Sequence, residues 1–176
     1  MPREIITKLE LIEQLAERKW DENWRFRTFI KWRDDRKSEE IDELVRETTD
    51  EVWRQIDCTD CANCCRKLQI VVDCDDIDRL AQHFRLTAKE FRKRHVVKGE
   101  DGELVLNRRP CPFLEGNICS VYDHRPKACH DFPYLHAPEF RTRMMMMVQN
   151  TTLCPIVYNT MEQLKDRLGF RRKRRR

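Results

Sequence analysis

The spacing of the cysteines is the feature that most constrains this chain. Eight of the nine cysteines fall into two groups: residues 58–65 follow the pattern C-x2-C-x2-C-C, and Cys111, Cys119, Cys129 and Cys154 come singly after a long gap. Thiols at this spacing can point to a common centre, as a soft or borderline metal requires. The Thr, Asp, Ala and Asn residues between them do not suit a buried apolar segment. The pattern therefore predicts that the two groups are halves of one metal site.

The composition limits how much apolar surface the chain can bury. It has 176 residues, of which 38% are charged, and its mean hydropathy is −0.79. A chain of this length predicts one main domain with a modest core, and a metal centre would add stability that the core cannot supply. No internal repeat is found, nor any linker that would separate two domains.

The two ends of the sequence bear on the cellular location of the protein and on nucleic-acid binding. Met1–Glu10 contains no apolar signal segment, and no apolar run is long enough to span a bilayer. We therefore expect a cytoplasmic protein, in which disulfides are disfavoured and cysteines serve as ligands. The block Arg171–Arg176 is entirely basic and accounts for the net positive charge. It has no interleaved aromatic residues, so it predicts a solvated tail and only weakly suggests nucleic-acid binding.

Apolar spacing and capping residues predict the local structure. Helices are expected over 5–15, 38–56, 75–84, 88–96 and 154–168, and a short helix after Pro126 carries Cys129. Strands or hairpins are expected at 68–73, around Asp101-Gly102 and around Glu115-Gly116-Asn117, whereas 141–148 suits either a strand or a helix. The aromatic-rich segment 20–32 is expected to pack against the body.

These elements predict an α+β fold, a small and mostly helical domain stapled by metal, with short β-hairpins. We predict three regions: an N-terminal helical extension (1–57) packed on the body, the cysteine-cluster domain (58–169) and a basic disordered tail (170–176).

The spacing leaves the metal open. Three close cysteines with a remote Cys-Pro are typical of ferredoxins, and the chain has Cys111-Pro112 and Cys154-Pro155. Eight cysteines are also compatible with two four-thiolate zinc sites, or with a binuclear site that uses the adjacent Cys64 and Cys65. Cys74 is predicted to be a small packing residue, and His130 is a substitute ligand if one cysteine is idle. The aspartates between 73 and 78 are interpreted as charges at a helix N-terminus. Arg125 either pairs with a nearby carboxylate or thiolate and tunes the metal centre, or forms a surface salt bridge.

A fixed order of motifs accompanies the first cysteine group. They are Cys111-Pro112-Phe113-Leu114, Cys119-Ser120-Val121-Tyr122, Arg125-Pro126 and Cys129-x-x-Phe132-Pro133. Together with Cys58–Cys65, they resemble the bacterial CxxCxxCC cysteine-cluster family, often called YkgJ-like, over about residues 55–160. The resemblance implies a zinc- or iron-chelating domain. The family's eight cysteines correspond here to Cys58, Cys61, Cys64, Cys65, Cys111, Cys119, Cys129 and Cys154.

Two functions follow from these observations. The first is a metal-binding protein whose zinc or iron centre is mainly structural and organises a domain that binds a protein partner. The alternative is an iron–sulfur protein with electron-transfer or oxidoreductase activity, because family members are described in both ways. The sequence contains no recognisable catalytic triad, carboxylate pair or glycine-rich phosphate loop, so it assigns no reaction.

Overall fold

The structure is a computed structural model that describes residues 4–32 and 34–171. Contacts between residues divide the chain into two compact units. Unit 1 comprises Met1–Asp57 and Pro133–Arg176, and unit 2 comprises Cys58–Phe132. The predicted division into extension, cysteine domain and tail stays a prediction, and most of the tail lies outside the described residues.

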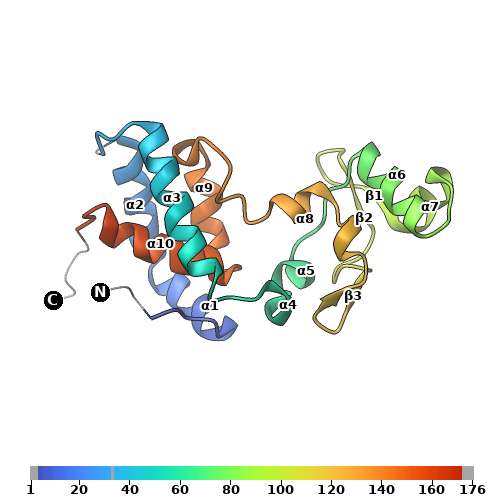
Figure 1. Cartoon of the computed structure of the whole chain (residues 1–176), viewed down its shortest axis with the longest axis horizontal. Coiled ribbons are helices and arrows are strands. Elements are labelled where there is room, and N and C mark those ends of the chain that lie inside the picture. The colour runs from blue at the N-terminus through green and yellow to red at the C-terminus, as the bar shows by residue number, and fades with distance from the viewer. Residues whose placement is uncertain (1–3, 33, 172–176) are drawn as a thin grey trace. The chain divides into compact units, whose positions relative to one another are not determined.

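Unit 1 is a helical bundle (Figure 1). Its helices are α1 (Leu9–Arg18), α2 (Trp20–Trp32), α3 (Ser38–Trp53), α9 (Phe140–Asn150) and α10 (Pro155–Arg167). α10 is the central helix, because every residue from Pro155 to Lys165 is buried and it contacts α1, α3 and α9. Pro155 stands in its first turn and Gly169 adopts a positive φ of 66° just beyond its end, as the sequence predicted.

Segment 141–148 is helical, which excludes the strand alternative. Met144, Met147 and Val148 are buried at helical spacing, while Met145 is 53% exposed. The preceding residue, Glu139, has a left-handed backbone (φ 59°) and gives α9 no side-chain cap. The cap comes instead from α3, where the Asp42 carboxylate accepts hydrogen bonds from the N–H groups of Glu139 (2.8 Å) and Phe140 (2.9 Å).

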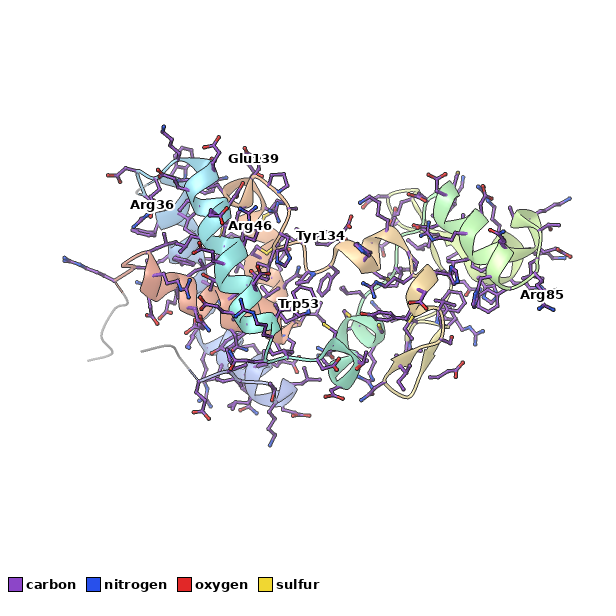
Figure 2. The ribbon with its side chains drawn as sticks, in the orientation of Figure 1. Arg36, Arg46, Trp53, Arg85, Tyr134 and Glu139 are labelled. Carbon is purple, nitrogen blue, oxygen red and sulfur yellow. The ribbon has the colours of Figure 1, made fainter. Side chains whose placement is uncertain are left out.

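The aromatic segment 20–32 packs only in part against the bundle. Phe26 and Ile30 are fully buried, whereas Trp32 is 76% exposed and Trp20 is 38% exposed. The expectation that the whole stripe would be packed is therefore wrong for Trp32, which stands at the end of α2 beyond the faces that contact α1 and α9. Figure 2 shows Trp53 at the end of α3.

Unit 2 contains short helices and two hairpins (Figure 1). Its elements are α4 (Cys58–Cys61), α5 (Asn63–Lys67), α6 (Cys74–His83), α7 (Ala88–His95), β1 (Val96–Lys98), β2 (Leu104–Leu106), β3 (Leu114–Glu115), β4 (Ile118–Cys119), the 3-10 turn η1 (Tyr122–His124) and α8 (Lys127–Asp131). Strands β1 and β2, and β3 and β4, pair antiparallel. Gly102 and Gly116 take positive φ in the two predicted turns, so both hairpins and the α+β class are confirmed.

The prediction of a strand at 68–73 is wrong, because the segment forms no regular strand. The segment runs beside β2 through two backbone hydrogen bonds, from Val72 N to Leu104 O and from Leu106 N to Ile70 O, and forms one isolated bridge, Val71–Val105. Alternate residues enter the core of unit 2, which is a cluster of Ile70, Val72, Ile77, Leu80, Ala81, Phe91, Leu106, Phe113 and Val121. The predicted alternation of buried and exposed residues was correct, but the pairing with β2 is too short to make the segment a strand.

Candidate metal centre

The first cysteine group forms an elbow of two short helices. Cys58 and Cys61 lie one turn apart in α4, and Cys64 and Cys65 lie in α5. Between the helices, Ala62 adopts a left-handed conformation (φ 45°), which breaks what would otherwise be one continuous helix. The break turns the second pair relative to the first.

A backbone hydrogen bond joins the two cysteine groups, which are far apart in the sequence. The N–H of Cys111 donates to the carbonyl of Cys65 at 2.8 Å, so the two cysteine groups meet at this point. Cys119 follows on β4, where it faces Leu114 in the β3–β4 hairpin. The hairpin turn is bound to α4 and α5, because the Arg66 guanidinium donates to the carbonyls of Cys61 (2.9 Å) and Gly116 (3.3 Å). Sequence reasoning gave Arg66 no role, since this contact exists only in the folded chain.

Cys129 is positioned by a buried carboxylate. Asp76 of α6 is 2% exposed, and its Oδ1 accepts a hydrogen bond from the Lys127 N–H at 2.9 Å and another from the Arg79 guanidinium. Arg79 also donates to the carbonyl of Arg125 at 3.2 Å. The pair thereby holds the backbone of 125–127, which leads into α8 and Cys129. The sequence predicted helix N-terminal roles for these aspartates, which is confirmed for the N-cap Asp73, but it did not indicate this contact of Asp76.

Removal of the Asp76 carboxylate should loosen the turn before Cys129. Asp76→Ala leaves the Lys127 N–H and Arg79 without their acceptor, so we expect about 3 kcal/mol less local stability. Amide hydrogen exchange at Lys127 and His130 would measure it. Asp78→Ala on the same helix is the matched control, because Asp78 is exposed, and it should change exchange by less than about 0.5 kcal/mol. Equal protection in both variants would contradict the positioning role.

Four thiols from these separate segments act on one another. Burial raises the pKa of Cys111 to about 11, and the charges of Cys65 and Cys119 add to this effect. Burial likewise raises the pKa of Cys129 to about 12, with further contributions from Cys111, Cys65 and Cys119. Burial also raises the pKa of Cys119. Because these charge effects connect the four thiols, they are treated as one group, here called the thiol cluster: Cys65, Cys111, Cys119 and Cys129.

Several donors favour negative charge in the thiol cluster. Cys65 has a pKa lowered to about 7, first by its hydrogen bond with Cys64, whose sulfur lies 4.0 Å away, and also by the Arg66 charge. Backbone hydrogen bonds from Phe113 and Val121 lower the pKa values of Cys111 and Cys119 against the effect of burial. Each donor lies two residues beyond its cysteine. These donors would help to stabilise the thiolate forms once a cation is bound.

The chemistry of the donors fits a soft or borderline metal, but their present arrangement is open. Among residues 4–32 and 34–171, no three Cys, His, Asp or Glu side chains converge closely enough to hold an ion. All nine cysteines lie in the described part of the chain, and none forms a disulfide.

A family model described as "CxxCxxCC: Putative zinc- or iron-chelating domain" matches residues 57–155, more than half of the sequence. The chain belongs to the CxxCxxCC family. Comparisons with curated proteins and with solved structures found no match. Within the described residues, no helix is both long enough and apolar enough to cross a bilayer.

The eight predicted ligands of this CxxCxxCC protein divide between the two units. Seven lie in unit 2: the thiol cluster together with Cys58, Cys61 and Cys64. Cys154 is buried in unit 1, directly before α10. Ligation by the full set of eight stays a prediction.

Cys74 is placed differently from the sequence prediction, whereas the role of His130 stays a prediction. Cys74 is not a packing residue: it is exposed at the start of α6, and Arg92 donates to its sulfur at 3.3 Å. His130 is exposed, and its Nδ1 lies 3.3 Å from Oδ1 of Asp131. The neighbouring residues in the sequence could not reveal that the Cys74 side chain faces solvent.

A polar cavity of about 680 Å³ is bordered by Arg125, which also acts on the thiol cluster. Its lining includes Tyr122, Arg125, His130 and Asp131. The Arg125 guanidinium stacks on the Tyr122 ring at 4.1 Å, and its positive charge lowers the pKa values of Cys119 and Cys129 against burial. Of the two roles that the sequence left open for Arg125, the thiolate partner is the one that this geometry favours.

Proposed function

We propose that unit 2 binds zinc or iron through thiolates of Cys65, Cys111, Cys119 and Cys129. The observation that carries this proposal is that four thiols, from α5, the loop before β3, β4 and α8, lie close enough for their charges to interact. A divalent cation between them would offset the burial and the repulsion that raise the pKa values of Cys111, Cys119 and Cys129. Four thiolates are also the donor set of structural zinc and of iron–sulfur sites.

The protein's own residues have separate tasks in this centre. The metal, when bound, supplies the positive charge that stabilises the thiolates and draws them together. The N–H groups of Phe113 and Val121 donate to the ligands, and Arg125 compensates part of the remaining negative charge. Asp76 and Arg66 hold the segments that carry Cys129 and Cys119.

A redox function is the second candidate. It is favoured by the cavity bordered by Arg125, which would give a small molecule access to the neighbourhood of the centre. It is also supported by Cys58, Cys61, Cys64 and Cys154, which increase the number of thiolates beyond what one zinc requires. The same residues would in that case hold an iron–sulfur cluster.

Metal analysis of protein purified without oxygen and without added metal tests both candidates. We expect one or two metal ions per chain. Zinc without acid-labile sulfide, in colourless protein that also fails anaerobic iron reconstitution, would reject the redox function. Iron with equal sulfide and a brown colour would reject the structural zinc function. Protein that contains no metal and takes up none from either ion would contradict the proposal itself.

Metal affinity should rise steeply with pH. The pKa values of Cys111 (about 11), Cys129 (about 12) and Cys119 (raised) mean that these thiols are protonated near neutral pH. Each must release a proton on binding, whereas Cys65, with a pKa of about 7, is already largely ionised at pH 8. The logarithm of the apparent affinity should therefore increase by about three per pH unit around pH 8. Competition against a chelator of known pH dependence measures this slope, and a slope near zero would contradict it.

A further inference from the structure

Positive charge is concentrated at one end of unit 2. Segment 85–109 carries eight cations and only four carboxylates, whereas the rest of the unit has more carboxylates than cations. The eight cations, all exposed, are called the basic surface: Arg85, Lys89, Arg92, Lys93, Arg94, Lys98, Arg108 and Arg109. The net charge of the whole sequence does not reveal this separation of positive and negative charge within unit 2.

The basic surface follows from the fold of α7 and its neighbours. Phe91 is fully buried, so Lys89 and Lys93 lie on the opposite face of the helix, and Arg92 lies on its side. The loop after β2 is bound to the last turn of α7, because the Asn107 side chain donates to the carbonyl of Arg94 at 2.7 Å and its N–H to that of His95 at 2.9 Å. This contact brings Arg108 beside α7. Figure 2 shows Arg85 extending from the turn between α6 and α7.

Few carboxylates lie near these cations in the described residues, and the one charge effect on a carboxylate is that of Arg94, which contributes to the lowered pKa of Glu90. In the described part of the chain, none of the eight forms an ion pair with a carboxylate. Arg92 instead donates to the Cys74 sulfur. Burial, together with the charges of Arg108 and Arg94, lowers the pKa of His95, which confirms that positive charges are crowded here. An external polyanion would relieve this repulsion.

Aromatic rings border the basic surface. Phe84 is 37% exposed, and its ring stacks on Phe113 (5.4 Å between centroids) and Phe91 (6.1 Å), which hold it rigidly. The exposed His83 ring lies 5.0 Å from it. A fixed, partly exposed ring next to cations is the combination that binds bases and phosphates of single-stranded nucleic acid.

We propose that the basic surface, with Phe84 at its edge, binds single-stranded nucleic acid. The cations lie on a turn, a helix, a strand and a loop, and α7 is only 8 residues long. A flexible single strand can contact cations that are spread over several elements, whereas a duplex groove is read by one helix or β-ribbon that fits into it. Counterion release from the phosphates would supply most of the affinity, and stacking on Phe84 would add to it.

Binding of a fluorescent uridine oligonucleotide of about 12 nucleotides to the full chain tests this proposal. The tail is first neutralised by serine at Arg171–Arg176, so that it contributes nothing. The test variant is Lys89→Ala/Lys93→Ala/Arg108→Ala. Its matched control, Lys8→Ala/Arg18→Ala/Arg54→Ala, removes the same charge from exposed positions in unit 1.

The test variant should bind about tenfold more weakly at low salt, and the slope of log affinity against log salt should fall by about two. The control should change affinity by less than about twofold. Phe84→Leu, with unfolding checked, should weaken binding about fivefold or more. Equal losses in both triple variants would overturn the proposal. So would an oligoglutamate peptide that binds as tightly and loses as much, because the surface would then recognise acidic proteins.

Discussion

Cys129→Ser should abolish stoichiometric metal binding. Cys129 has the most strongly raised pKa of the thiol cluster, and its side chain is acted on by the other three sulfurs. Serine is nearly isosteric but ionises far too weakly to replace a thiolate. Mutation of a residue that only hydrogen-bonds to a metal ligand lowers metal affinity by about 10- to 100-fold. Because Cys129 is itself a proposed ligand, we expect its loss to lower the affinity by more than about 100-fold. Metal content and chelator competition measure the effect.

Cys74→Ser is the control for this experiment. Cys74 lies in the same unit but outside the family's pattern, and its sulfur contacts Arg92. It should retain full metal content and affinity. If Cys74→Ser and Cys129→Ser lose metal equally, or if neither does, the assignment of the thiol cluster is wrong.

Cys154→Ser extends the comparison to the remaining predicted ligand. Cys154 belongs to unit 1, so its assignment depends on the family pattern alone. As a ligand it should lose affinity as Cys129→Ser does. Unchanged metal content, in protein whose unit 1 remains folded, would reduce the predicted set to the seven cysteines of unit 2.

The second large effect is expected from the buried ion network of unit 1. Lys165 is fully buried, and its ammonium donates to Glu162 (2.5 Å), Asn23 (2.6 Å) and Glu22 (2.8 Å). Glu162 also accepts from Lys19 at 2.6 Å. Glu162→Leu removes the carboxylate that both lysines share and should cost about 3–5 kcal/mol, because a buried charge loses its main partner.

The double variant Glu162→Leu/Lys165→Met should recover most of that loss, since it removes the buried charge together with its partner. Tryptophan fluorescence in urea is suited to the measurement, because all four tryptophans lie in unit 1. A double variant no more stable than Glu162→Leu alone would contradict this interpretation.

The same network predicts a loss of stability in acid. Burial alone would raise the pKa of Glu162, but Lys165 and Lys19 lower it below its ordinary value. A lowered pKa gives stability that is present above the unfolded-state pKa and is lost as the pH falls through the folded-state value. The double variant should lack this contribution.

Local features of the fold were predictable because their causes lie within a few residues. Thr87 and Glu90 form the expected capping box before α7. Gly102 and Gly116 form the expected turns, and Gly169 follows the last helix. Errors arose where contacts with distant segments decide the outcome: segment 68–73 forms only one isolated bridge, and Trp32 is 76% exposed.

The sequence by itself determined the chemistry that is available. The spacing of its cysteines specified thiol ligands, and their motifs specified the family, because both are written in neighbouring residues. Only the tertiary structure decided which thiols interact electrostatically, which carboxylate holds the backbone before Cys129, and where the cations of segment 85–109 gather. Those relations join residues far apart in the chain. They depend on how α6, α7 and the two hairpins pack, which no local period or turn residue encodes.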